Sequence, residues 1–116
     1  MTSLSLPFPP STNGLYKNVK GGRVKTARYL AWQVLATLQL RQQRPTPVSG
    51  RYRLSLTLDA PDARRRDADN LIKAVSDLLV SQGVISDDHM AQAISVEWSD
   101  LPPAKPGRVT IKLEAA

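Results

Sequence analysis

A run of three arginines directly precedes two aspartates that are separated by one residue. The acids are Asp67 and Asp69, and Lys73 follows four residues after the second one. The basic residues of the run are Arg64, Arg65 and Arg66. Carboxylate oxygens are the ligands that Mg²⁺ prefers, and a metal held by two or three of them can neutralise a phosphodiester and activate a water. Because guanidinium groups bind phosphates, this stretch contains the parts of a metal-dependent nuclease.

Two further acids, Asp87 and Asp88, follow the expected helix that begins near Asp69. Lys73 could neutralise the negative charge that builds up on a phosphate in the transition state. His89 is the only histidine, and it is either a proton shuttle beside Asp88 or an incidental neighbour. No pattern of the Ser-His-Asp kind and no Gly-rich phosphate loop is present.

The same acids also have an ordinary structural interpretation. Aspartates at a helix start can cap free N–H groups and complement the helix dipole. Asp69 and Lys73 could form an exposed i,i+4 pair, with Asp77 as another solvated partner. The pair at Asp87 and Asp88 is common in turns. Spacing alone therefore leaves open whether these acids bind a metal or only shape the backbone.

Positive charge is concentrated in the first part of the chain. The net charge is +6 with a pI near 10.1, yet residues 1–66 contain 12 of the 16 Lys and Arg and only two acids. A basic surface of this kind favours an anionic partner such as DNA. The expected loop at 9–25 contributes four of these residues around Tyr16. It either contacts the DNA backbone or is only a solvated hairpin or an irregular loop. The four residues are Lys17, Lys20, Arg23 and Lys25.

Hydrophobic patterning indicates a single α/β (α+β) domain over residues 1–116. Alternation predicts strands at 3–8, 51–60, 93–98 and 108–115, and three-to-four-residue spacing predicts helices at 27–43 and 69–81. We expect the order β-α-β-α-β-β, with one mixed sheet of about four strands and both helices packed on it. Apolar residues form one stripe on the first helix, and Trp32 lies off its centre, facing a second layer or a partner chain. The stripe consists of Ala27, Leu30, Ala31, Val34, Leu35 and Leu38.

Composition points to the cytoplasm as the compartment. The chain has no cysteine, which excludes disulfides and thiolate zinc sites. No apolar run approaches the ~20 residues of a membrane span, and the N-terminus lacks the features of a signal peptide.

The motif as a whole resembles the RusA family of Holliday junction resolvases, found in bacteria and their prophages. The family pattern R-R-R-D-x-D-N-x-x-K, then G-x-x-x-D-D, corresponds to residues 64–73 and 83–88, and it includes Asn70. The stretches at 6–16 and 107–114 are similar to the opening turn and last strand of the family. This resemblance covers nearly the whole chain in order and length.

The resemblance implies a homodimer that cleaves branched DNA, the four-way junction, in recombination and repair. Cleavage would depend on Mg²⁺, with Mn²⁺ as a possible substitute. Asp67, Asp69 and Asp88 would be the metal-site carboxylates and Lys73 the functional lysine. Asp87 and Asn70 would have supporting roles. The arginine run and the residues of the 13–25 loop would lie near phosphates.

A helix over 69–81 would be roughly 20 Å long, and Asp88 would lie beyond its end. Metal ligands must lie within about 2–2.5 Å of one ion. Either the following loop folds back along the helix, or Asp88 comes from a second subunit. We hypothesise the second arrangement, since a two-fold dimer would also present two equivalent sites to a four-way junction.

Two other functions remain open from the sequence. One is a basic DNA-binding module without catalysis, in which the acids serve only as caps and turns. The other is a metal-dependent hydrolase of free nucleotides, which would show no preference for branched DNA and no salt-sensitive DNA affinity.

Overall fold

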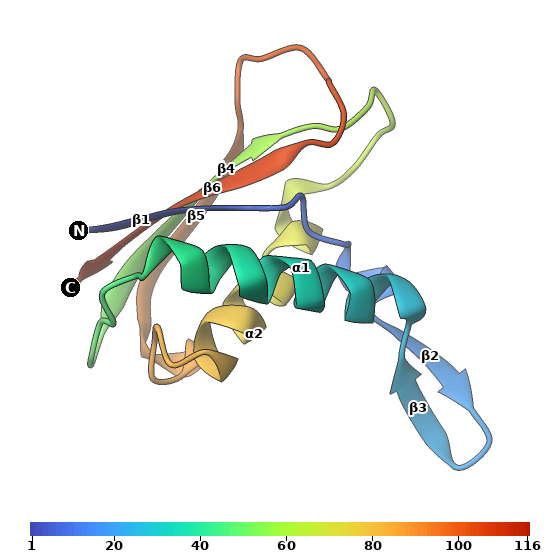
Figure 1. Ribbon diagram of the computed structural model, residues 1–116, viewed down its shortest axis with the longest axis horizontal. Coiled ribbons are helices and arrows are strands. Elements are labelled where there is room, and N and C mark those ends of the chain that lie inside the picture. The colour runs from blue at the N-terminus through green and yellow to red at the C-terminus, as the bar shows by residue number, and fades with distance from the viewer.

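The computed structural model describes residues 1–116 and contains one main sheet, two α-helices and a separate hairpin (Figure 1). The main-sheet strands are β1 (Thr2–Leu6), β4 (Tyr52–Asp59), β5 (Ala91–Trp98) and β6 (Arg108–Ala115). The helices are α1 (Ala27–Gln43) and α2 (Lys73–Ser81), and the hairpin strands are β2 (Tyr16–Val19) and β3 (Gly22–Lys25). Three short 3₁₀ turns are η1 (Thr12–Gly14), η2 (Ala68–Leu71) and η3 (Asp88–Met90).

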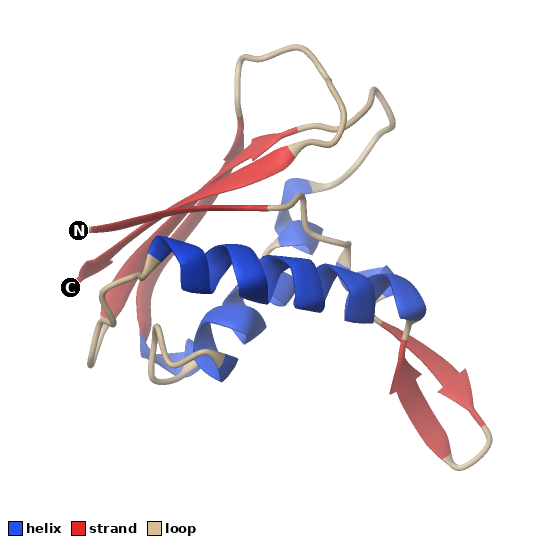
Figure 2. Ribbon diagram, in the orientation of Figure 1, coloured by secondary structure: helices blue, strands red, loops and turns tan.

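The main sheet is mixed, with the strand order β1-β6-β4-β5. β6 pairs antiparallel with both β1 and β4, whereas β4 and β5 pair in parallel. A parallel pair needs a crossover connection, and α2 provides it. Apart from the additional hairpin, this confirms the expected order and the α+β class (Figure 2).

The core lies between one face of the sheet and the two helices. Along β4, Leu54, Leu56 and Leu58 are buried, while Ser55 and Arg53 between them point to the other, polar face. β1 and β6 alternate in the same way, as the sequence predicted. At the free edge β5, Ile94 and Trp98 stay about two-fifths exposed. This edge of the sheet is therefore accessible from the helix side.

α1 packs on the sheet with the face opposite to the predicted stripe. Tyr29, Trp32, Ala36 and Leu40 are buried. The stripe is exposed to solvent instead. Its four large residues have 48% to 65% of their surface exposed: Leu30, Val34, Leu35 and Leu38. The stripe alone would suggest that this side of the helix faces the sheet. The opposite side does so instead, because α1 is apolar on two faces and its aromatic side chains bury the larger area. Trp32 also donates a hydrogen bond to the Pro7 carbonyl at 3.0 Å.

The helix predicted at 69–81 begins later than expected. η2 replaces its first turn, and α2 starts only at Lys73. Asp and Asn are weak helix formers, which favours the tighter turn over residues 68–71. The helix ends as expected before Gly83, whose φ of 73° suits glycine.

The segment between β1 and α1 contains a projecting hairpin rather than an irregular loop (Figure 1). Gly21 and Gly22 both have positive φ, which allows the tight connection between β2 and β3. The first strand ends at Leu6, earlier than predicted, because Pro7 stops it. Neither helix has the length and apolar character required to cross a membrane.

Candidate functional site

Five of the residues singled out in the sequence, His89 among them, line one hollow beside α2, near the free edge of the sheet. It has a volume of about 530 Å³ and is here called the carboxylate hollow. It is lined by Asp69, Lys73, Asp77 and Asp88, together with Thr12, Ile72, Ser76, His89 and Ile94. Asp69 and Asp88 of a single chain therefore line the same hollow. The helix is shorter than predicted and the chain turns back beside it, so the helix length alone does not separate the two residues.

The connection after α2 is anchored in the core, and this places Asp88. Val84 and Ile85 are buried, and the Val48 amide donates to the Val84 carbonyl at 2.8 Å. Three residues further on, η3 begins at Asp88 and contacts α2. The buried connection thus returns the chain to the side of α2 just before β5 starts.

Neither of the first two aspartates makes the side-chain contact that the ordinary interpretation gave it, although both stand at the start of η2. Asp67 occupies the N-cap of η2, but its side chain makes no capping hydrogen bond. Asp69 forms no ion pair with Lys73, whose ammonium lies 3.2 Å from the Asp77 carboxylate instead. Both carboxylates are therefore free of cationic partners within the chain.

Asp87 stabilises the turn that carries Asp88. Its carboxylate accepts hydrogen bonds from the His89 backbone amide at 3.2 Å and lies 3.0 Å from His89 Nδ1. Hydrogen bonds from His89 lower the pKa of Asp87 to about 2. This arrangement fits a supporting role for Asp87 and leaves His89 oriented by its neighbour.

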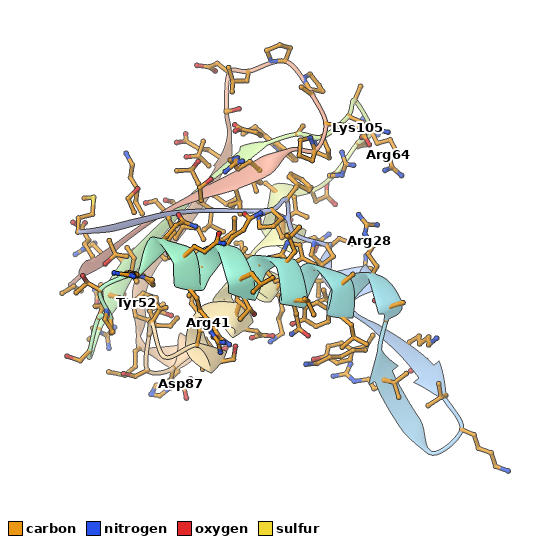
Figure 3. The ribbon with its side chains drawn as sticks, in the orientation of Figure 1. Arg28, Arg41, Tyr52, Arg64, Asp87 and Lys105 are labelled. Atoms are coloured by element: carbon orange, nitrogen blue, oxygen red, sulfur yellow. The ribbon has the colours of Figure 1, made fainter.

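Asp67 lies outside the carboxylate hollow, beside two adjoining depressions that we call the arginine hollows. The two share Ser11, Arg65, Arg66 and Leu71; one adds Asn13, Asp67 and Asn70, and the other adds Phe8, Pro9, Arg28 and Arg64. Arg28 and Arg64 lie on the same side of the molecule (Figure 3). Four guanidinium groups around one depression suit a phosphate. Arg28 was not predicted, because one basic residue at a helix start carries no distinctive signal.

Two of the three motif arginines are already paired within the chain. Asp62 lies 3.1 Å from Arg64 and 2.8 Å from Arg66, and their hydrogen bonds lower its pKa far below the ordinary value. Arg66 also lies over the Phe8 ring at 5.3 Å, and only 14% of its side chain is exposed. The side chain of Arg64 stays 74% exposed. Arg66 therefore stabilises the conformation of the motif through contacts inside the chain, whereas the exposed Arg64 side chain can still reach a ligand.

The hairpin carries exposed cationic groups away from the body of the molecule. Arg23 lies over the Tyr16 ring at 4.5 Å, and Lys25 lies over the Tyr29 ring at 5.5 Å and donates to Gln33 at 3.3 Å. The contacts of Lys25 hold the base of the hairpin against α1, whereas the contact of Arg23 lies within the hairpin. Lys17 and Lys20 are exposed further along the hairpin. The Thr12 hydroxyl, at the start of the same segment, donates to the Asn70 carbonyl at 3.0 Å.

The chain does not bring three acidic or histidine side chains together at one point suited to a metal ion. The donor chemistry of the carboxylate hollow nevertheless fits Mg²⁺. This ion is usually bound by one or two carboxylates, and waters and substrate phosphates complete its coordination. Asp69 and Asp88 are two such groups, and neither forms an ion pair.

Comparison with known proteins gives consistent matches over most of the chain. The family model described as "Endodeoxyribonuclease RusA" matches residues 7–114. The crossover junction endodeoxyribonuclease RusA of Escherichia coli K12 is 31% identical, covering 96% of this chain and 92% of its own length. The proteins of that name from Aquifex aeolicus and from enterobacteria phage HK97 are 34% and 32% identical, over 73% and 93% of this chain and 68% and 89% of their own lengths. The chain therefore belongs to the RusA endodeoxyribonuclease family.

Proposed function

We propose that this protein is a metal-dependent endonuclease that resolves four-way DNA junctions in recombination and repair. The observation that carries this proposal is the carboxylate hollow, where Asp69, Asp88 and Lys73 lie together. The arginine hollows beside Asp67 supply the neighbouring phosphate-binding groups. Family membership supports the nuclease chemistry, and the names of the relatives support junction DNA as the substrate.

In this proposal Asp69 and Asp88 hold Mg²⁺, or Mn²⁺ in its place, and Asp67 adds a carboxylate from the side of the arginine hollows. The bound ion would activate a water and neutralise the scissile phosphate. Lys73 would offset the negative charge that develops on the phosphate oxygens. The Asp77 carboxylate holds the Lys73 ammonium at the hollow, since these two groups lie 3.2 Å apart.

The basic groups outside the hollow would bind the DNA backbone. Arg28, Arg64 and Arg65 border the arginine hollows and can hold phosphates next to the cleaved one. The hairpin projects further, so its lysines would contact a second segment of the DNA (Figure 1). Two contact regions on one chain suit a branched substrate better than a single straight duplex.

We also propose that two copies of the chain pair through the exposed stripe of α1, here called the outer face of α1. A helix that is apolar on both faces is normally covered on both. α1 contains no acid, and its only charged residues are Arg28 and Arg41, near its two ends. Such an apolar, nearly uncharged surface suits a second copy of itself better than DNA. A two-fold dimer would present two equivalent sites for symmetric cuts.

Cleavage of a four-way junction and of a linear duplex with the same sequences tests the proposal at controlled salt. Wild-type protein with Mg²⁺ should nick the junction in symmetric pairs and leave the duplex largely intact. Asp69→Asn should bind the junction equally well and make no nicks. Asp100→Asn, the same substitution at an acid outside all three hollows, should behave as wild type.

Other outcomes of that assay would identify the other functions. Binding by wild-type protein without symmetric nicks would indicate a DNA-binding module without catalysis. Hydrolysis of free nucleotides without salt-sensitive DNA binding would indicate a nucleotide hydrolase.

The bacterial and phage relatives support a role in the bacterial cytoplasm, on chromosomal or prophage DNA.

A further inference from the structure

A buried tyrosine reaches from the sheet to the turn that carries Asp88. Tyr52 is the first residue of β4 and has no exposed surface. Its hydroxyl donates a hydrogen bond to the backbone carbonyl of Asp88 at 3.3 Å, across 36 positions of sequence. Tyr52 pairs in the sheet with Ala91, the residue at which β5 begins. The hydroxyl therefore acts at the junction between η3 and the edge strand.

The turn that Tyr52 contacts is also capped by Asp87, but it is short and mostly exposed. No residue of η3 is fully buried, and the turn consists of only three residues. The Asp88 carbonyl accepts the Ala91 amide as well as the tyrosine hydroxyl. Two donors on one carbonyl define the orientation of its peptide plane, and hence the direction in which the Asp88 side chain leaves the backbone. A ligating carboxylate must be placed to within about 0.5 Å to function.

The same hydroxyl also lies on the side of α2. Ser76 is one of two buried polar residues of the chain, and it lines the carboxylate hollow. Burial raises the pKa of Tyr52, and Ser76 opposes that rise. Lys73 lies one helical turn before Ser76 on the same hollow. Tyr52 therefore lies between the helix that carries Lys73 and the turn that carries Asp88.

We propose that Tyr52, with Ser76, is a positioning residue for the metal site. It holds the Asp88 carboxylate where it can bind the same ion as Asp69. The inference rests on the proposed function, because it assumes that these carboxylates bind a divalent cation. Loss of a residue that orients a metal ligand without binding the metal typically lowers metal affinity by about 10–100-fold. Tyr52 contacts a backbone carbonyl rather than the carboxylate itself, so we expect the lower end of that range.

Tyr52→Phe tests this inference, because it removes the hydroxyl and keeps the buried ring. The concentration of Mg²⁺ that gives half-maximal junction cleavage should rise about 10-fold. Excess Mg²⁺ should restore most of the rate, and junction affinity in chelator should be unchanged. Calorimetric titration of Mn²⁺ into the protein without DNA should show the same weakening. Ser76→Ala should shift both measurements in the same direction by less.

Thr2→Val is the matched control. The Thr2 hydroxyl also donates to a distant backbone carbonyl, that of Thr46 at 2.9 Å, but it lies on the opposite edge strand β1. This variant should have the metal dependence of wild type. Unchanged metal dependence in both Tyr52→Phe and Ser76→Ala would overturn the inference, provided that Asp88→Asn is inactive. Full activity of Asp88→Asn would instead overturn the proposed function itself.

Discussion

Asp69 and Asp88 line the same hollow of one chain, although a helix and a buried connection lie between them in the sequence. The connection turns back at Gly83 and is held by the buried side chains of Val84 and Ile85. Both carboxylates of the proposed metal site are thus present in each copy. The proposed site can therefore take its two main ligands from one subunit, and the proposed dimer would supply the second site for the second cut.

Mixing of two inactive variants distinguishes a site within one chain from a shared one. Asp69→Asn and Asp88→Asn should each be inactive, and their mixed dimers should stay inactive, because every chain then lacks one of the two carboxylates. The measurement is junction nicking after the two proteins are unfolded and refolded together. Recovery of single nicks in the mixture would show that Asp69 of one subunit acts with Asp88 of the other.

Glutamate substitutions on the outer face of α1 should separate the proposed dimer. Val34→Glu and Leu38→Glu place a charge where an apolar partner is expected, which we estimate to cost about 3 kcal/mol, or roughly 100-fold in the dimer Kd. Both positions are more than half exposed, so the fold itself should be retained. Sedimentation velocity should show monomers, and paired nicking should be lost.

The control for this prediction is Leu101→Glu. Leu101 is 64% exposed in the loop between β5 and β6, so it matches the α1 residues in exposure but not in location. It should sediment as wild type does. If the α1 variants also sediment as wild type does, the dimer forms through another surface, and the free edge of β5 would be the next one to examine.

The sequence predicted the strands well because each strand has only one apolar face. In β4, leucines alternate with polar residues, so only one orientation buries them. α1 has apolar residues on two faces, and its periodicity does not say which face meets the sheet. The ring contact of Tyr29 with Tyr16 and the hydrogen bond from Trp32 to Pro7 decide it, and both partners lie in the segment before α1 rather than in the helix itself.

The composition of the site was easier to predict than its geometry. The motif identified Asp67, Asp69 and Lys73 because their types and spacing are local features. The length estimate that placed Asp88 far away assumed one continuous helix, but η2 replaces the first turn. Asp62 was missed as well, although its position just before the arginine run could have indicated a partner for those residues.

Charge removal on the hairpin should weaken DNA binding in a salt-dependent way. Lys17→Gln with Lys20→Gln should reduce the slope of log Kd against log salt by roughly 0.9 for each lysine that contacts a phosphate. Lys112→Gln, on the polar face of the sheet, should leave the slope unchanged. Equal slopes for the double variant and wild type would mean that the hairpin stays away from the DNA. The measurement is fluorescence anisotropy with labelled junction at several salt concentrations, in chelator.

The pairing of Asp62 with Arg64 and Arg66 should make a small, acid-sensitive contribution to stability. Their hydrogen bonds lower the pKa of Asp62 below the ordinary value of 3.8. The folded state therefore favours the ionised carboxylate, so this stabilisation is present above about pH 4 and disappears as the pH falls through the lowered pKa. Asp62→Asn should melt slightly below wild type at neutral pH, and the difference in Tm should narrow on acidification. A difference that stays constant down to about pH 2 would show that the loss arises from packing rather than from charge.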